Sequence, residues 1–69
     1  MTDKTTGVRA ARTRAGLRQA DLAAAVGVSR QTIISLERGD YSPSVYLALR
    51  IARVLESTVE ELFPLSEED

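Results

Sequence analysis

The sequence contains no cysteine and no histidine. Their absence excludes disulfides, thiolate chemistry and the commonest metal ligands, so no metal site is expected. It also removes the commonest general base, and neither a P-loop nor a dinucleotide-binding glycine motif is present. Ser29 and Ser35 have no partner that would activate a nucleophile. We therefore expect a protein that is not an enzyme and needs no cofactor.

Long apolar runs are also missing. No segment approaches the roughly 20 apolar residues of a membrane-spanning helix, and no signal peptide opens the chain. The sequence therefore predicts a cytoplasmic protein with no membrane partner. Its 69 residues make one small domain, 1–69, with an ordered core over about 5–65 and an acidic tail over 66–69. A core of this size often gains stability from a second subunit.

The charge is unevenly distributed along the chain, although the net charge is only −1. Residues 4–38 hold seven basic and two acidic side chains, a balance of +5. Residues 39–69 hold two basic and seven acidic side chains, a balance of −5. Such a chain can turn its basic half toward phosphate while its acidic half faces away. The alternative interpretation is that the charges lie on an ordinary solvated surface and are segregated along the chain by chance.

Hydrophobic spacing and capping residues predict an all-α fold. Five helices are expected, over residues 5–15, 19–26, 30–37, 45–55 and 59–63. Ser29, Ser44 and Thr58 are typical N-caps at the starts of the last three. Gly16 and Gly39 follow the expected ends of the first and third. In the first helix, the spacing predicts that Val8, Ala11 and Ala15 face inward.

Residues 19–39, QADLAAAVGVSRQTIISLERG, predict a helix-turn-helix. Leu22, Ala23 and Val26 fall on the inward face of the first helix, and Ile33 and Leu36 on that of the second. A glycine at 27 supplies the positive φ that the turn between them needs.

From about Val8 to Phe63 the chain resembles the phage-repressor/Cro type of regulator, also called the xenobiotic-response-element family. The resemblance implies a five-helix, lambda-repressor-like DNA-binding domain whose second and third helices form the helix-turn-helix. The partner that it implies is double-stranded DNA.

The outward face of the helix over 30–37 is expected to contact bases. Arginine can bond two acceptors of guanine, glutamine can pair with adenine, and an apolar side chain can contact a thymine methyl. In the family, the positions that match Arg30, Gln31 and Ser35 contact bases. The expected base-contacting residues are Arg30, Gln31, Ile34 and Ser35.

Phosphate contacts are expected from helix ends and loops around that helix. In the family, the position of Gln19, at the start of the helix over 19–26, holds a phosphate together with backbone N–H groups. The expected phosphate-contacting residues are Gln19, Arg18, Thr32, Arg38, Tyr41 and Ser42. The Tyr41 ring has a structural alternative, since it could simply cover the loop after residue 37.

Arg12 and Glu37 match family positions that often form a largely buried ion pair, and we expect a structural role for both. Removing one partner of a buried pair costs about 3–5 kcal/mol. If both side chains were exposed, the pair would contribute at most about 1 kcal/mol.

The helix over 45–55 carries two apolar stripes about a third of a turn apart. We expect the first, Val45, Ala48, Leu49, Ala52 and Leu55, to pack on the core. The second, together with the end of the chain, predicts a two-fold dimer interface formed by Leu47, Ile51, Val54, Leu62, Phe63 and Leu65. For Ile51, a wider core contact is an equal alternative.

These features predict a sequence-specific transcriptional regulator, a homodimeric repressor that occludes a promoter at an inverted-repeat operator. No small-molecule effector domain is expected. The alternative is an antitoxin-type protein-binding module that binds DNA for autoregulation. The chain also departs from the family at Glu56-Ser57, where Gly-Val is usual.

Overall fold

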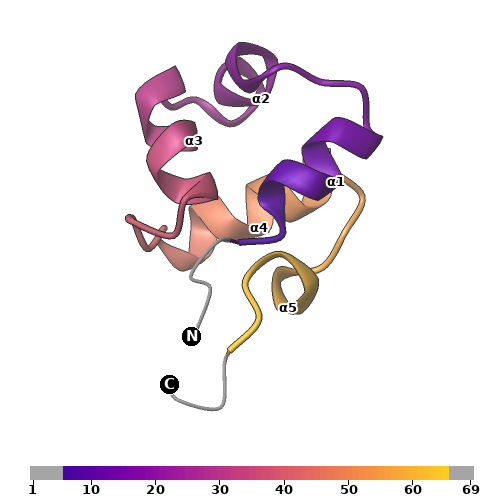
Figure 1. The fold of residues 1–69 in the computed structure, drawn as a ribbon, viewed down its shortest axis with the longest axis vertical. Helices are drawn as coiled ribbons and strands as arrows, with labels where there is room; N and C mark the ends of the chain where they lie inside the picture. The colour runs from indigo at the N-terminus through magenta and orange to yellow at the C-terminus, as the bar shows by residue number, and fades with distance from the viewer. Residues whose placement is uncertain (1–5, 66–69) are drawn as a thin grey trace.

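Five short helices make up the protein in the computed structural model, which describes residues 6–65 (Figure 1). In chain order they are α1 (Val8–Arg14), α2 (Gln19–Val26), α3 (Arg30–Glu37), α4 (Val45–Val54) and α5 (Val59–Leu62). Residues 6–65 contain no strand, which confirms the all-α prediction. The acidic tail predicted over 66–69 lies outside the described residues. Within the described residues, no helix is long and apolar enough to cross a membrane.

The three predicted N-caps are confirmed. The hydroxyl oxygens of Ser29, Ser44 and Thr58 each accept a hydrogen bond from a backbone N–H three residues later, at 3.1 Å in all three cases. Each cap satisfies one of the N–H groups that the first turn of a helix leaves without an intrahelical partner. The starts of α3, α4 and α5 are therefore fixed by local sequence.

The first helix is shorter than predicted. It ends at Arg14, because the chain turns through Ala15 into Gly16 at φ +75°. Ala15 consequently lies exposed beyond the end of α1, and its predicted inward position is wrong.

The segment before α1 is held by both the third and the last helix. The Thr6 N–H donates to Glu37 O at 3.2 Å, and the Gly7 N–H donates to Leu62 O at 2.8 Å. A Cβ at Gly7 would lie 2.7 Å from Glu61 O, so only glycine fits this close approach. The bond from Gly7 thus joins the beginning of the described chain to α5, near its end.

The predicted helix-turn-helix is confirmed. Gly27 has φ +78°, and the following Val28 N–H donates to Ala23 O at 3.0 Å, which closes the end of α2. The chain then enters α3, and α2 and α3 pack against each other. In Figure 1 the two helices adjoin at one end of the molecule.

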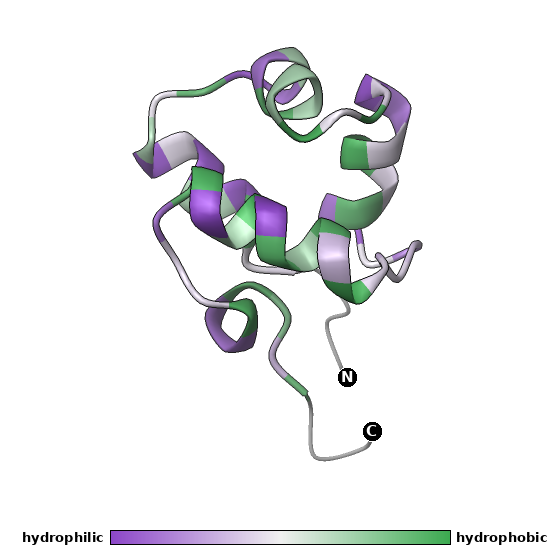
Figure 2. Cartoon of the chain, turned by 180° about the vertical axis from the view of Figure 1, so that it is seen from behind, coloured by the Kyte–Doolittle hydropathy of each residue, from purple (hydrophilic) through white to green (hydrophobic). Residues whose placement is uncertain are grey.

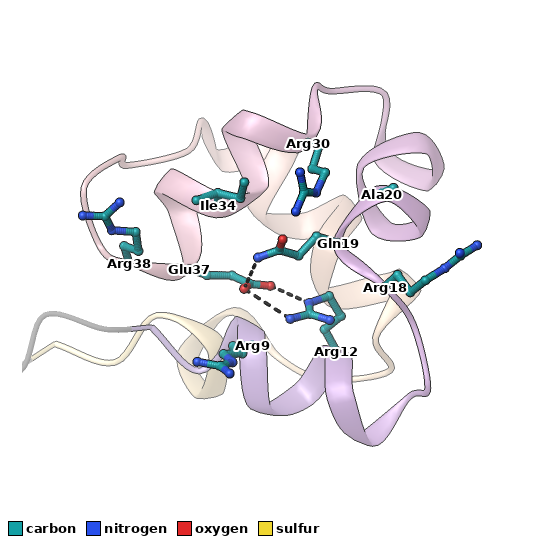
Figure 3. Close-up of a pocket in the computed structure, with 9 residues that line it drawn as sticks. All are labelled: Arg9, Arg12, Arg18, Gln19, Ala20, Arg30, Ile34, Glu37 and Arg38. Atoms are coloured by element: carbon teal, nitrogen blue, oxygen red, sulfur yellow. Dashed lines mark hydrogen bonds and ion pairs between the residues drawn. The ribbon is translucent and has the colours of Figure 1, made fainter.

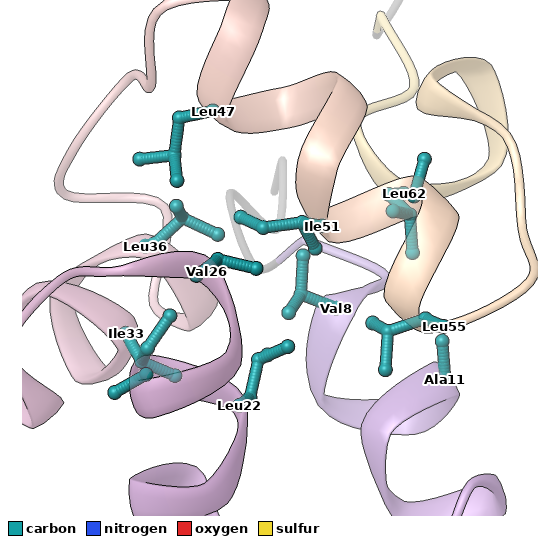
Figure 4. Close-up of a cluster of buried hydrophobic side chains, with 12 residues drawn as sticks. Val8, Ala11, Leu22, Val26, Ile33, Leu36, Leu47, Ile51, Leu55 and Leu62 are labelled. Carbon is teal, nitrogen blue, oxygen red and sulfur yellow. The ribbon is translucent and has the colours of Figure 1, made fainter.

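All five helices contribute to one hydrophobic core. Figure 4 shows Val8 of α1 and Ile51 of α4 in the middle of the cluster, with Leu22 and Ile33 on the side of the helix-turn-helix. Burying such a side chain completely stabilises the fold by about 1.5–3 kcal/mol relative to leaving it exposed. The fully buried large side chains are Leu22, Ile33, Leu36, Ile51, Leu62 and Val8.

The rotation of α4 differs from the prediction. Leu47 and Ile51 are 4% and 0% exposed, whereas Val45 and Leu49 are 73% and 51% exposed. Ala48, Ala52 and Leu55 face the core as predicted. They lie at the border of the two apolar stripes, so their burial does not show which stripe packs on the core. Tertiary packing decides instead: Leu47 and Ile51 lie beside Leu36, Val26 and Val8 (Figure 4).

The predicted dimer interface is therefore wrong for three of its six residues, and for Ile51 the alternative of a core contact is confirmed. Leu47, Ile51 and Leu62 are buried inside the chain's own core, and Val54 and Phe63 are half-buried against it. Leu65 is 86% exposed. The exposed large apolar side chains of α4 are Val45, Tyr46 and Leu49. Figure 2 shows α4 crossing the middle of the molecule, with hydrophobic and hydrophilic residues following one another in short groups.

The turn from α4 to α5 contains a strained residue. Glu56 has φ +52°, a left-handed conformation that costs an L-residue about 1–2 kcal/mol. This is the position where the resemblance implies glycine, a residue that adopts such a φ without strain.

Candidate nucleic-acid interface

A basic cleft of about 640 Å³ opens between α1, the start of α2, and α3 (Figure 3). Five arginines line it, against one buried carboxylate. This concentration of positive charge is the kind that attracts nucleic-acid phosphates. The lining residues are Arg9, Arg12, Arg18, Gln19, Ala20, Arg30, Ile34, Glu37 and Arg38.

The Arg12–Glu37 ion pair lies at the base of this cleft. Arg12 Nε donates to Glu37 Oε2 at 2.6 Å, and Arg12 Nη2 donates to Glu37 Oε1 at 3.4 Å. The two side chains are only 12% and 5% exposed, which corresponds to the buried alternative. Arg12 Nη1 also donates to Leu17 O at 2.8 Å, so the guanidinium holds the turn between α1 and α2 as well.

Gln19 is bound to this ion pair. Its Nε2 donates to Glu37 Oε1 at 3.2 Å, while its carboxamide oxygen faces away from Glu37, on the side of the cleft where Arg30 lies (Figure 3). This contact could not be predicted from the sequence, because the two residues are 18 positions apart and no local pattern relates them.

Arg18 is the N-cap residue of α2 and pairs with Asp21. The Arg18 backbone N–H donates to Asp21 Oδ2 at 2.9 Å, and Arg18 Nε donates to the same oxygen at 3.1 Å. The hydrogen bonds from the Arg18 side chain and backbone hold the pKa of Asp21 below its usual value. Because the Arg18 side chain is 85% exposed, it can leave this pair for a phosphate at little cost.

The first turn of α3 presents its outward side chains beside the cleft. Arg30 and Gln31 are exposed, while Ile34 and Ser35 are half-buried. Ile34 lines the cleft and is less exposed than the sequence suggested. The Thr32 hydroxyl lies 2.9 Å from Ser29 Oγ, so it belongs to the N-cap of α3.

The remaining predicted phosphate contacts follow α3. Arg38 lines the cleft and pairs with Asp40, Nε to Oδ2, at 3.4 Å. Tyr41 and Ser42 are exposed in the loop before α4 and do not line the cleft. Tyr41 is 44% exposed, and both its phosphate contact and the alternative that its ring covers the loop stay predictions.

Sequence reasoning missed Arg9, an exposed arginine of α1 that lines the cleft. A signal for it was present. Arg9 precedes Arg12 by three residues, and residues at this spacing share one face of a helix.

A family model described as helix-turn-helix matches residues 8–62 of the chain. The chain belongs to this helix-turn-helix family. It is accordingly a transcriptional regulator with a helix-turn-helix DNA-binding domain, and α2 and α3 are the two helices of the motif.

Relatives and solved structures agree with this assignment. An HTH-type transcriptional regulator of Methanothermobacter thermautotrophicus is 53% identical, over 88% of this chain and 90% of the relative. One of Archaeoglobus fulgidus is 45% identical, over 93% and 91%. The crystal structure of the restriction-modification controller protein C.AhdI from Aeromonas hydrophila is 36% identical, has a TM-score of 0.73 and covers 81% of both chains. The clp gene regulator ClgR from Corynebacterium glutamicum is 30% identical with a TM-score of 0.73, over 77% of this chain and 68% of that one.

Proposed function

We propose that the protein binds a specific double-stranded DNA sequence as a homodimer and represses transcription by occluding a promoter at an inverted-repeat operator. The observation that carries this proposal is the basic cleft beside the first turn of α3. It offers phosphate-binding charge next to side chains that can reach base edges. Such a regulator would act in the cytoplasm.

Base recognition is assigned to the outward face of α3. Its fully buried residues Ile33 and Leu36 fix which side of the helix faces out. The first turn of a recognition helix normally reaches base edges in the major groove. The proposed base contacts are Arg30, Gln31, Ile34 and Ser35.

Phosphate binding is assigned to the rim of the cleft and to the loop after α3. Arg9 joins the residues proposed from sequence, because it lines the cleft and is exposed. Arg12 is excluded, because its guanidinium is already bound to Glu37 and Leu17 O. The proposed phosphate contacts are Arg9, Gln19, Arg18, Thr32, Arg38, Tyr41 and Ser42.

Specific binding with a steep salt dependence is the direct test. Each phosphate that the protein neutralises should add about −0.9 to the slope of log K against log salt concentration. At physiological salt, a duplex selected from a random pool should bind at least about 10³ times more tightly than a scrambled duplex of the same composition. Titrations of both duplexes over a series of salt concentrations measure the slope and the ratio. Equal affinities for the two would contradict sequence-specific recognition.

A homodimer follows from the reach of one recognition helix. A single copy of α3 reads only a few base pairs, too few to select one promoter among a genome's competing sites. Two copies related by a two-fold axis double the readout. Their recognition helices then lie about 34 Å apart, so the operator half-sites are about 10 base pairs apart, centre to centre.

The second copy is proposed to dock on the exposed apolar patch formed by Val45, Tyr46 and Leu49 of α4. Three of the five exposed large hydrophobic side chains lie within these five residues, and the other two are Tyr41 and Leu65. Val45 and Leu49 are one helical turn apart, so they form a continuous surface on α4. This patch replaces the buried stripe that the sequence suggested.

Replacing Leu49 by glutamate should weaken dimerisation by about tenfold or more, because the carboxylate would be buried without a partner in the interface. Sedimentation equilibrium measures the change. Ala10→Glu adds the same charge at an exposed position of α1 and should leave the dimer intact. A wild-type protein that stays monomeric at micromolar concentration, yet binds one half-site as tightly as two, would contradict the dimer.

A further inference from the structure

We propose that Glu37 is a positioning residue for DNA binding: one of its carboxylate oxygens holds the Gln19 carboxamide in the orientation that meets a phosphate. The proposal rests on the proposed phosphate contact of Gln19 and gives Glu37 a second role besides its ion pair with Arg12. Glu37 itself touches no DNA in this arrangement, because it is 4% exposed.

The two carboxylate oxygens of Glu37 have different partners. Oε2 accepts the short bond from Arg12 Nε at 2.6 Å. Oε1 accepts from Gln19 Nε2 at 3.2 Å and from Arg12 Nη2 at 3.4 Å. Arg12 alone would satisfy the carboxylate as an ion pair, so the bond from Gln19 is an additional connection between the end of α3 and the start of α2.

A carboxylate fixes the direction of a carboxamide because it can only accept hydrogen bonds. Gln19 must therefore turn its NH₂ group toward Glu37, as Figure 3 shows, and its oxygen away. One N–H is used in that bond, which leaves the second as a donor that a phosphate can share with the backbone N–H groups at the start of α2. These donors can bind one phosphate together.

Fixing Gln19 before DNA arrives removes a cost of binding. A free glutamine side chain must be immobilised when it contacts a phosphate, which lowers affinity by about 3- to 10-fold. If Glu37 acted only through its charge, its removal would change the DNA affinity in the opposite direction. A negative charge among five arginines weakens the attraction for phosphate, so its removal would strengthen binding if charge were its only role.

The chain is suited to a direct measurement on the free protein, since its only side-chain amides belong to Gln19 and Gln31. Gln31 is exposed on α3 and serves as an internal reference. By ¹⁵N relaxation, the Gln19 NH₂ group should have an order parameter above about 0.6 and that of Gln31 a lower one. In the Arg12→Met/Glu37→Met variant the Gln19 value should fall to that of Gln31. Equal mobility of the two amides in the wild type, or an unchanged Gln19 in the variant, would overturn the positioning role.

A DNA-binding experiment compares the loss of affinity that Gln19→Ala causes in two backgrounds, the wild type and Arg12→Met/Glu37→Met. Replacing a buried ion pair by apolar residues of similar volume usually preserves the fold, and thermal unfolding checks this. If Glu37 positions Gln19, the fold-loss in DNA affinity caused by Gln19→Ala should be about 3- to 10-fold smaller without the pair. Equal losses in both backgrounds would keep the phosphate contact and overturn the positioning role alone. No loss in either would overturn the phosphate contact itself, and the DNA role of Glu37 with it.

Discussion

Arg12→Ala is expected to lower the free energy of unfolding by about 3–5 kcal/mol. The substitution leaves the Glu37 carboxylate buried without its cation, and the desolvated charge is what makes the loss large. In a domain of this size, each kcal/mol shifts the melting temperature by about 4–8 °C. Urea titration and thermal melts followed by circular dichroism measure the loss.

Arg14→Ala is the matched control, because Arg14 lies on the same helix at an exposed position. It should change stability by no more than about 0.5 kcal/mol. Arg12→Met/Glu37→Met, which removes both charges, should recover most of the stability that Arg12→Ala loses. Equal effects of Arg12→Ala and Arg14→Ala would mean that the pair contributes as little as an exposed one.

Arg30→Ala is expected to weaken binding to the selected operator by about 1–3 kcal/mol, or roughly 5- to 150-fold, and to relax the preference at one base pair per half-site. The reason is the loss of a side chain that can bond two acceptors of one guanine. Gln31→Ala should act in the same way at a neighbouring base pair. Binding titrations against a set of singly substituted operators measure both the loss and the position.

Gln19→Ala separates positioning contacts from base readout, since it should weaken binding to all sequences alike. Arg30→Ala also removes one positive charge. Arg53→Ala controls for that loss, because Arg53 is an exposed arginine of α4 outside the cleft lining. If Gln19→Ala altered base preference while Arg30→Ala did not, the assignment of α3 to the major groove would be incorrect.

Local signals in the sequence predict much of this fold. Ser29, Ser44 and Thr58 set helix starts through bonds that span three residues, and the glycine at 27 marks a turn that other residues adopt only at a cost. The amphipathic face of α3 likewise follows from spacing, so the residues proposed to read bases could be chosen before the structure. Features that depend on neighbours within a few positions can be predicted from the sequence in this way.

Features that depend on contacts between distant residues could not be predicted from the sequence. Both stripes of α4 have helical spacing, and only the packing of Leu47 and Ile51 on the other helices decides which one is buried. The hydrogen bond from Gln19 to Glu37 joins two helices, and the pairing of Arg12 with Glu37 was accessible only through the family resemblance. The strain at Glu56 became evident only from its backbone angle, although the absence of the usual glycine marked the position in the sequence.

The hydrogen bond from the Gly7 N–H to Leu62 O has a consequence for how the molecule assembles. It joins residues 55 positions apart, since 62 minus 7 is 55, and Leu62 is also fully buried in the core cluster to which Val8 belongs. Because a chain is synthesised from its N-terminus, Gly7 and α1 are made well before Leu62, with which Gly7 pairs. The helix-turn-helix can form its own local contacts earlier, but the core closes only when α5 is made. The core is therefore complete only after residue 62 has been made.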